Sequence, residues 1–211
     1  MKHVAIASAF AVLFIGQAAP SMWMAVDHSQ RLKEGREVTL AVETRDPRDL
    51  FRGEYSVLSY EIARPRNVQT STSGLASGCD LTSARSCSVG PEQPVFIRLQ
   101  PDQTGVHRAA QVMFEQPTDG APFIVGKVRA GAIIKGGVGT GAIRCEREAC
   151  FEGIIAFGIE TWYGPQGVPA QVDRIDRKDI VVRAKVDASG RPALDALVVK
   201  GQDFARTPRL L

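Results

Sequence analysis

The sequence predicts a mainly β protein, a single antiparallel β-barrel or sandwich-like domain that follows one N-terminal transmembrane helix. Beyond residue 35, short runs of alternating or β-branched residues are separated by Gly, Pro, Asp and Ser, which is the pattern of strands and turns. Residues 4–26 contain no Asp, Glu, Lys or Arg. We therefore expect a membrane anchor or signal segment with a short helical stem over residues 1–34, and an extracytoplasmic β domain over residues 35–211.

The N-terminal segment fits two alternatives. As one helix at about 1.5 Å per residue, residues 4–26 would extend roughly 34 Å, enough for the ~30 Å hydrocarbon core of a bilayer. Lys2, a short apolar run and small residues at positions 16 and 18 also fit a signal peptide that is cleaved after Ala18. Pro20 separates the two, because it either bends the helix or ends it. We expect a single-pass protein of the cell inner membrane that faces the periplasm, or a protein secreted to the periplasm if the leader is cleaved.

Composition and cysteines limit the choice of partners and compartment. The 26 Lys and Arg against 23 Asp and Glu give a net charge of +3, which argues against nucleic-acid binding through a broad basic face. Cys79 and Cys87, and Cys145 and Cys150, are spaced C-x7-C and C-x4-C, which misses the usual spacing of zinc ligands. Two local disulfides are the favoured interpretation, although four cysteines allow three pairings, and free thiols are the remaining alternative. Disulfides require an oxidising compartment such as the periplasm.

The β domain is expected to contain nine strands, over residues 37–44, 55–63, 95–100, 106–115, 123–130, 138–145, 151–157, 180–186 and 194–200. A helical stem is expected at residues 27–32 and a helical turn at 169–176. We expect residues 67–91, which are rich in Ser, Thr and Gly, to form a long excursion from the core, a loop held by the disulfide of the first cysteine pair. The glycines of residues 135–141 read as a flexible hairpin, because the Gly-Lys-Ser/Thr ending of a phosphate loop is missing.

The densest polar motif enters the second expected strand, and its candidate binding residues are Asp46, Arg48, Arg52, Gly53, Glu54, Tyr55 and Tyr60. A rigid loop held by ion pairs is the favoured interpretation, because turn residues outnumber reactive ones. The alternative is a binding site, in which the two arginine side chains suit a carboxylate or a phosphate. A second group of candidate binding residues consists of Glu160 and Tyr163, which flank Trp162 in the sequence. We expect Glu160 to lie over Arg48 or Arg52 in one cleft. Aromatic packing under a surface loop is the alternative.

Catalysis has little support in the sequence. Beyond the leader His28 and His107 are the only histidines, so a Ser-His-Asp arrangement has few possible bases. No residue cluster has metal-ligand spacing and no dinucleotide fingerprint is present, so we expect no cofactor. The runner-up to a binding protein is an envelope hydrolase such as a Ser-Lys peptidase, with Ser21 and Lys127 as its pair.

The polar motif also carries a resemblance. The stretch Gly53-Glu54-Tyr55-x-x-Leu58-x-Tyr60, preceded by Asp46-Pro47-Arg48-Asp49-Leu50-Phe51-Arg52, closely resembles the motif of the uncharacterised bacterial membrane-anchored GDYxxLxY family. Glu54 departs from the family, which has Asp at this position. The resemblance covers residues from about 22 to 200, whereas the cysteines and the Ser/Thr-rich excursion lie outside the pattern. It implies an uncleaved anchor, an extracytoplasmic domain and no assigned reaction. We therefore expect an accessory or interaction protein that binds an inner-membrane protein partner or a small anionic ligand.

Overall fold

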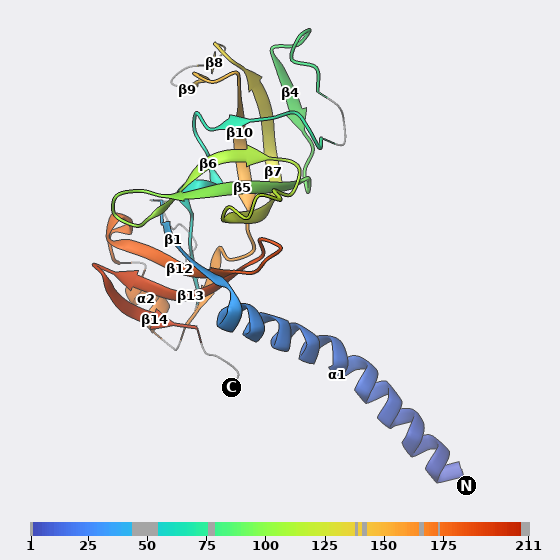
Figure 1. Ribbon diagram of the computed structural model, residues 1–211. Coiled ribbons are helices and arrows are strands. Elements are labelled where there is room, and N and C mark those ends of the chain that lie inside the picture. The colour runs from blue at the N-terminus through green and yellow to red at the C-terminus, as the bar shows by residue number, and fades with distance from the viewer. Residues whose placement is uncertain are drawn as a thin grey trace.

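The N-terminal helix and a β domain are the two parts of the computed structural model (Figure 1), which describes residues 2–43, 55–75, 79–137, 139–140, 143–164, 167–172 and 174–207. Helix α1 (Lys2–Glu34) projects from the base of the domain, which it contacts through β12 and β13. Its last turns are fixed there, because Leu32 is buried and Arg31 donates a hydrogen bond to the carbonyl of Pro192 at 3.4 Å. Within the described residues, no helix has both the length and the apolar character needed to cross a bilayer.

One large mixed sheet forms the domain. In spatial order it contains β14 (Gln202–Arg206), β13 (Pro192–Val199), β12 (Ile180–Val186), β1 (Arg36–Ala41), β6 (His107–Met113), β3 (Gln69–Thr70), β10 (Ala149–Ala156), β7 (Phe123–Lys135) and β4 (Ser86–Val89). Strand β5 (Pro94–Pro101) pairs with both β6 and β7, so the sheet curls over itself. Two small sheets pair β2 (Tyr55–Val57) with β11 (Thr161–Tyr163), and β8 (Gly139–Thr140) with β9 (Ile143–Arg144). Short helices η1 (Glu61–Ala63), α2 (Val168–Val172) and η2 (Arg177–Asp179) complete the described elements.

The predicted mainly β class is confirmed in its sandwich-like form. The described residues form no closed barrel, because β3 contributes two residues between β6 and β10 and covers little of that side. The expectation of a purely antiparallel sheet is wrong at two places, since β6 pairs in parallel with both β1 and β3.

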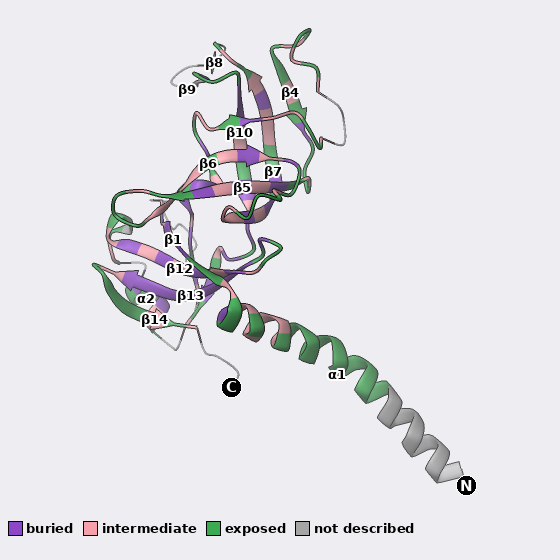
Figure 2. Ribbon diagram, viewed as in Figure 1, coloured by how far each residue is buried: buried purple, intermediate pink, exposed green. Residues whose placement is uncertain are grey.

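The hydrophobic core follows from the strand patterns. In β12, Ile180, Val182, Ala184 and Val186 are buried and alternate with half-buried residues, as expected of a strand with one face on the core. Strand β13 is buried from Pro192 to Val198, which requires cover on both of its faces. Figure 2 shows this contrast between neighbouring strands.

Several boundaries differ from the predictions. The expected strand at 55–63 ends at Val57 and is followed by η1, although Leu58, Tyr60 and Ile62 keep their alternating burial. The excursion at 67–91 contains β3 and β4, and the run at 138–145 contains β8 and β9 instead of one strand. The short strands β11 and β14 were not expected. The helical stem at 27–32 is confirmed as part of α1. Of the helical turn expected at 169–176, residues 169–172 lie in α2, which ends at Val172.

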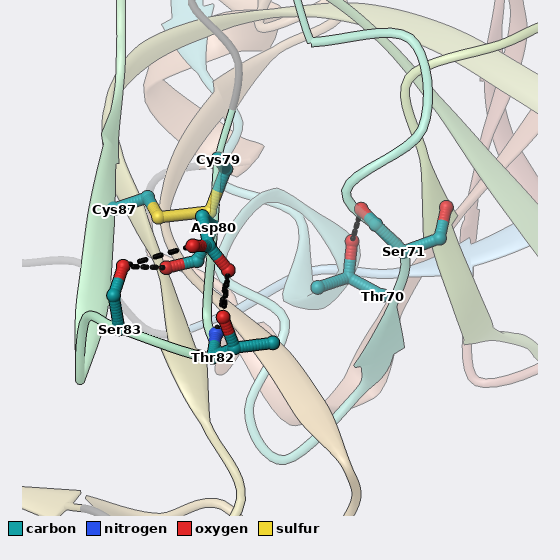
Figure 3. The surroundings of a disulfide bond; sticks show 7 residues. All are labelled: Thr70, Ser71, Cys79, Asp80, Thr82, Ser83 and Cys87. Carbon is teal, nitrogen blue, oxygen red and sulfur yellow. Dashed lines mark hydrogen bonds between the residues drawn. A yellow bond between two sulfur atoms is a disulfide. The ribbon is translucent and has the colours of Figure 1, made fainter.

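Both predicted disulfides form with local pairing. Cys79 bonds to Cys87 and Cys145 to Cys150, with Sγ–Sγ distances of 2.03 and 2.13 Å, so the zinc and free-thiol alternatives are wrong. Figure 3 shows the first disulfide beside a tight turn, in which the Asp80 carboxylate accepts hydrogen bonds from the Thr82 amide at 2.8 Å and the Ser83 hydroxyl at 2.9 Å. The crosslink thus ties β4 to a turn that is itself locally ordered.

Candidate functional site

Strands β2 and β11 bring parts of the two predicted site segments side by side. Their antiparallel register pairs Tyr55 with Tyr163, Ser56 with Trp162, and Val57 with Thr161. The rings of Tyr55 and Tyr163 lie 5.8 Å apart between centroids and are tilted by 45°, a geometry typical of favourable aromatic pairs. These two tyrosines, about a hundred residues apart in the sequence, therefore share one surface.

The two faces of this strand pair differ sharply in exposure. On the inner face, Ser56 is fully buried and its hydroxyl donates to the carbonyl of Pro169 in α2 at 3.1 Å. Trp162 beside it is 3% exposed. The next residue past β11 is Gly164, where a Cβ would approach the Trp162 ring to 2.1 Å, so the chain crosses this ring without a side chain. On the outer face, Val57 is 48% and Tyr163 72% exposed.

Tyr60 fixes the motif strand from within the core. It has no exposed surface, and its hydroxyl donates to the carbonyl of Ile159 at 2.6 Å. The Leu58 amide also donates to the carbonyl of Glu160 at 2.7 Å. Burial, with a smaller contribution from the negative charge of Glu160, holds the pKa of Tyr60 well above its ordinary value. The phenol therefore stays protonated and serves as a donor that joins the two motif segments.

Glu160 orders the turn between β10 and β11. Its two carboxylate oxygens accept the backbone amides of Phe157 and Gly158, the latter at 2.9 Å. Gly158 has a φ of +79°, a left-handed conformation that glycine adopts without steric cost. The Glu160 carboxylate thus stabilises a turn in which any residue with a side chain at position 158 would be strained.

The remaining predicted residues of the motif are Asp46, Arg48, Arg52, Gly53 and Glu54. They lie outside the described residues, as does the expected contact of Glu160 with Arg48 or Arg52. Their role in a binding site stays a prediction.

The described residues do not assemble the Ser-Lys pair of the runner-up hydrolase. Ser21 is exposed on the projecting part of α1. Lys127 lies on β7, and its ammonium group hydrogen-bonds to Glu92 at 2.9 Å. Figure 1 shows α1 leaving the domain at the opposite end from β4, the strand that pairs with β7.

A second concave feature, which we call the β1/β6 groove, opens where β1 and β6 separate. The two strands are paired at Leu40 and His107 alone, and beyond this point Val42 bridges to Tyr60. The groove has a volume of about 830 Å³, within the ~300–1,000 Å³ usual for ligand pockets. Its charged lining residues are Glu43, Glu61, Arg64, Arg66, Arg108 and Lys178.

Sequence reasoning missed this groove because its lining comes from four separate segments of the chain. Arg108 on β6 is held by Asp102, at 3.0 Å, and by Glu61. Lys178 pairs with Asp176 at 2.9 Å. The local signal that could have indicated it is the triplet Arg64-Pro65-Arg66, which follows η1 directly.

Comparison with known proteins identifies the family and no individual relative. No curated protein and no solved structure matches the chain. The family model described as "GDYXXLXY protein" matches residues 17–197. This range includes the last part of α1, the motif from Gly53 to Tyr60, strand β11 and most of β13. Because the match spans most of the 211 residues, the chain belongs to the GDYXXLXY protein family.

Proposed function

We propose that this protein is a membrane-tethered, extracytoplasmic accessory protein of the cell envelope that binds an inner-membrane protein partner. The contact surface is the outer face of β2 and β11, formed by Tyr55, Val57, Thr161 and Tyr163, which we call the partner face. The observation that carries this proposal is the large exposure of Tyr163 and Val57 on a strand pair whose opposite face is buried. Tyrosines are enriched among the residues that dominate binding energy at protein interfaces.

The rigidity of the partner face favours binding. Ser56 and Tyr60 anchor β2 through buried hydrogen bonds, and the ring of Tyr163 already contacts that of Tyr55. Side chains that are held in place before association lose less conformational entropy when a partner binds. The face therefore offers apolar area at a lower entropic cost than a mobile loop would.

Helix α1 supports the tether. Its exposed large apolar side chains are Leu13, Phe14, Ile15, Met22, Trp23, Met24 and Val26. A soluble surface rarely exposes so many apolar residues together, and a lipid bilayer would cover them. The two disulfides favour a domain on the periplasmic side, because such bonds persist in oxidising compartments.

Site-specific photocrosslinking in native membranes tests the partner face. A photoreactive residue is placed at position 163, or at position 204 as a matched control, because Phe204 is an exposed aromatic residue on the edge strand β14, which pairs with β13 and is not part of the β2–β11 sheet. We expect a discrete protein adduct at position 163 and none at position 204. The same adduct, captured through a crosslinker at position 57, should decrease at least fivefold in a Tyr163→Ala background. Equal adducts at 163 and 204, or none at either, would contradict the proposal.

The tether has its own measurement. The protein should stay with the membrane fraction after washing with alkaline carbonate, and a protease added to spheroplasts should digest the domain. Release into the soluble fraction would refute the tether without bearing on the partner face.

A further inference from the structure

We propose that the β1/β6 groove binds a small amphipathic oxyanion, a phosphate or carboxylate carried on an apolar group, with Arg64 and Arg66 contacting the oxyanion. This site is separate from the partner face, and the proposal does not depend on that face. It rests on the shape of the groove, on the distribution of its ion pairs and on the backbone between the two arginines.

Part of the lining of the groove is apolar. Val42, Ile62 and Ile180 are 7%, 2% and 1% exposed and form its base. Val68, Val106, Ala109 and Val181 also line it and are half-buried. An apolar group placed here would cover side-chain surface that water now contacts, a gain of roughly 25 cal/mol for each Å² removed from water.

The ion pairs leave two of the four lining cations available to a ligand. Arg108 already contacts two carboxylates and Lys178 contacts one. Arg66 lies 3.8 Å from Glu43 and is 70% exposed, and an exposed pair of this kind contributes little free energy. Arg64 has no ion-pair partner among the described residues. An incoming oxyanion could therefore contact Arg64 directly and replace Glu43 beside Arg66.

Arg64 and Arg66 lie on either side of one buried proline and line the same groove. Pro65 is buried, whereas Arg64 and Arg66 are exposed, and both line the groove. The proline ring fixes its own φ and so restricts the backbone between the two arginines. Two guanidinium groups held on one rim offer planar pairs of N–H donors that match the oxygens of a phosphate or carboxylate.

Glu61 does not oppose this assignment, because its charge is used within the protein. The carboxylate of Glu61 contacts the guanidinium of Arg108, which links η1 to β6 across the groove. The oxyanion contacts are therefore left to Arg64 and Arg66.

Equilibrium dialysis of the full chain in nanodiscs of zwitterionic lipid tests the proposal, with empty discs as blanks. The probes are phenyl phosphate, inorganic phosphate and phenol, which supply both features, the anion alone and the ring alone. We expect saturable binding of phenyl phosphate at least tenfold tighter than that of either partial probe. Equal binding of inorganic phosphate or of phenol would overturn the amphipathic assignment, and no saturable binding would overturn the site.

Paired variants then locate the site. Arg64→Gln with Arg66→Gln should weaken phenyl phosphate binding at least tenfold. The matched control is Lys127→Gln with Arg129→Gln, which removes two cations of the same i, i+2 spacing and similar exposure on β7, away from the groove. An unchanged affinity in the first pair, or an equal loss in both pairs, would contradict the assignment. Loss of partner-face crosslinking has no bearing on either result.

Discussion

The two ends of the large sheet hold their outer strands in different ways. At the β12–β13–β14 end, β13 is buried from Pro192 to Val198 and packing covers both of its faces. At the other end, Val89 is the one buried residue of β4, and the far half of β7 beyond Val128 is mostly exposed or half-buried. Both disulfides lie at this second end, where one ties β4 and the other closes the turn before β10. Apolar burial stabilises one end, and covalent crosslinks compensate for less burial at the other.

The largest effect is expected at the packed end. Leu197 on β13 is fully buried, so Leu197→Ala should lower the free energy of unfolding by about 2–5 kcal/mol through lost burial and the cavity it leaves. Urea unfolding followed by tryptophan fluorescence measures this change. The control is Phe204→Ala on the exposed edge strand β14, which should cost about 1 kcal/mol or less. Equal costs for the two variants would remove the case for a packed end.

The second-largest effect is expected at the end of the sheet that carries the two disulfides. Replacing Cys79 and Cys87 by serine frees a short loop, and the chain-entropy relation gives a loss of about 2.5 kcal/mol for a loop of this length. Amide exchange should accelerate more in β4 than in β12 and β13, because the crosslink restrains β4 directly. Hydrogen exchange with mass spectrometry measures the difference. Equal acceleration in all three strands would mean that the two ends do not differ as described.

The same contrast between buried and exposed strands explains how much of the fold could be predicted from the sequence. Strands such as β5 and β12 were predicted well because their buried residues alternate regularly. Strands β3, β4, β11 and β14 are short or mostly exposed, so they lack the periodic apolar signal on which prediction depends. The helix η1 interrupts a stretch whose burial still alternates, and alternation cannot distinguish the two conformations.

The candidate sites show a similar limit. The motif residues Tyr55 and Tyr60 could be named from sequence because they cluster in one polar stretch. That Tyr55 would contact Tyr163, and that Tyr60 would be buried against Ile159, depends on the β2–β11 pairing. The β1/β6 groove depends wholly on tertiary structure, because its lining residues extend from Ala41 to Val181.

A smaller effect is expected where the motif joins the core. Tyr60→Phe removes the hydroxyl that donates to Ile159 and leaves a buried carbonyl without that partner, which should cost about 1–2 kcal/mol. Tyr163→Phe is the matched control, since its ring is 72% exposed and stability should change by less than about 0.5 kcal/mol. Thermal and urea unfolding of both variants measure the difference. If both cost the same, the buried hydrogen bond does not stabilise the motif strand.

The smallest expected effect lies at the joint between the two ends, where His107 of β6 pairs with Leu40 of β1 and accepts the Thr39 amide at Nδ1. Burial, with the positive charge of Arg36, lowers the pKa of His107 below 6.5, although Asp102 opposes the shift. Well above pH 6.5 the side chain is neutral in both the folded and the unfolded state, and pH has no effect through this group. As pH falls below 6.5, the unfolded chain binds the proton first, so the free energy of unfolding decreases.

Between pH 7 and 5, His107→Gln should therefore lose less stability than the wild type in urea titrations. His28→Gln is the control, because the pKa of His28 is also lowered, by its burial on α1, and that variant should keep the part of the pH dependence that belongs to His107. A pH dependence unchanged by His107→Gln would show that this joint does not titrate with folding.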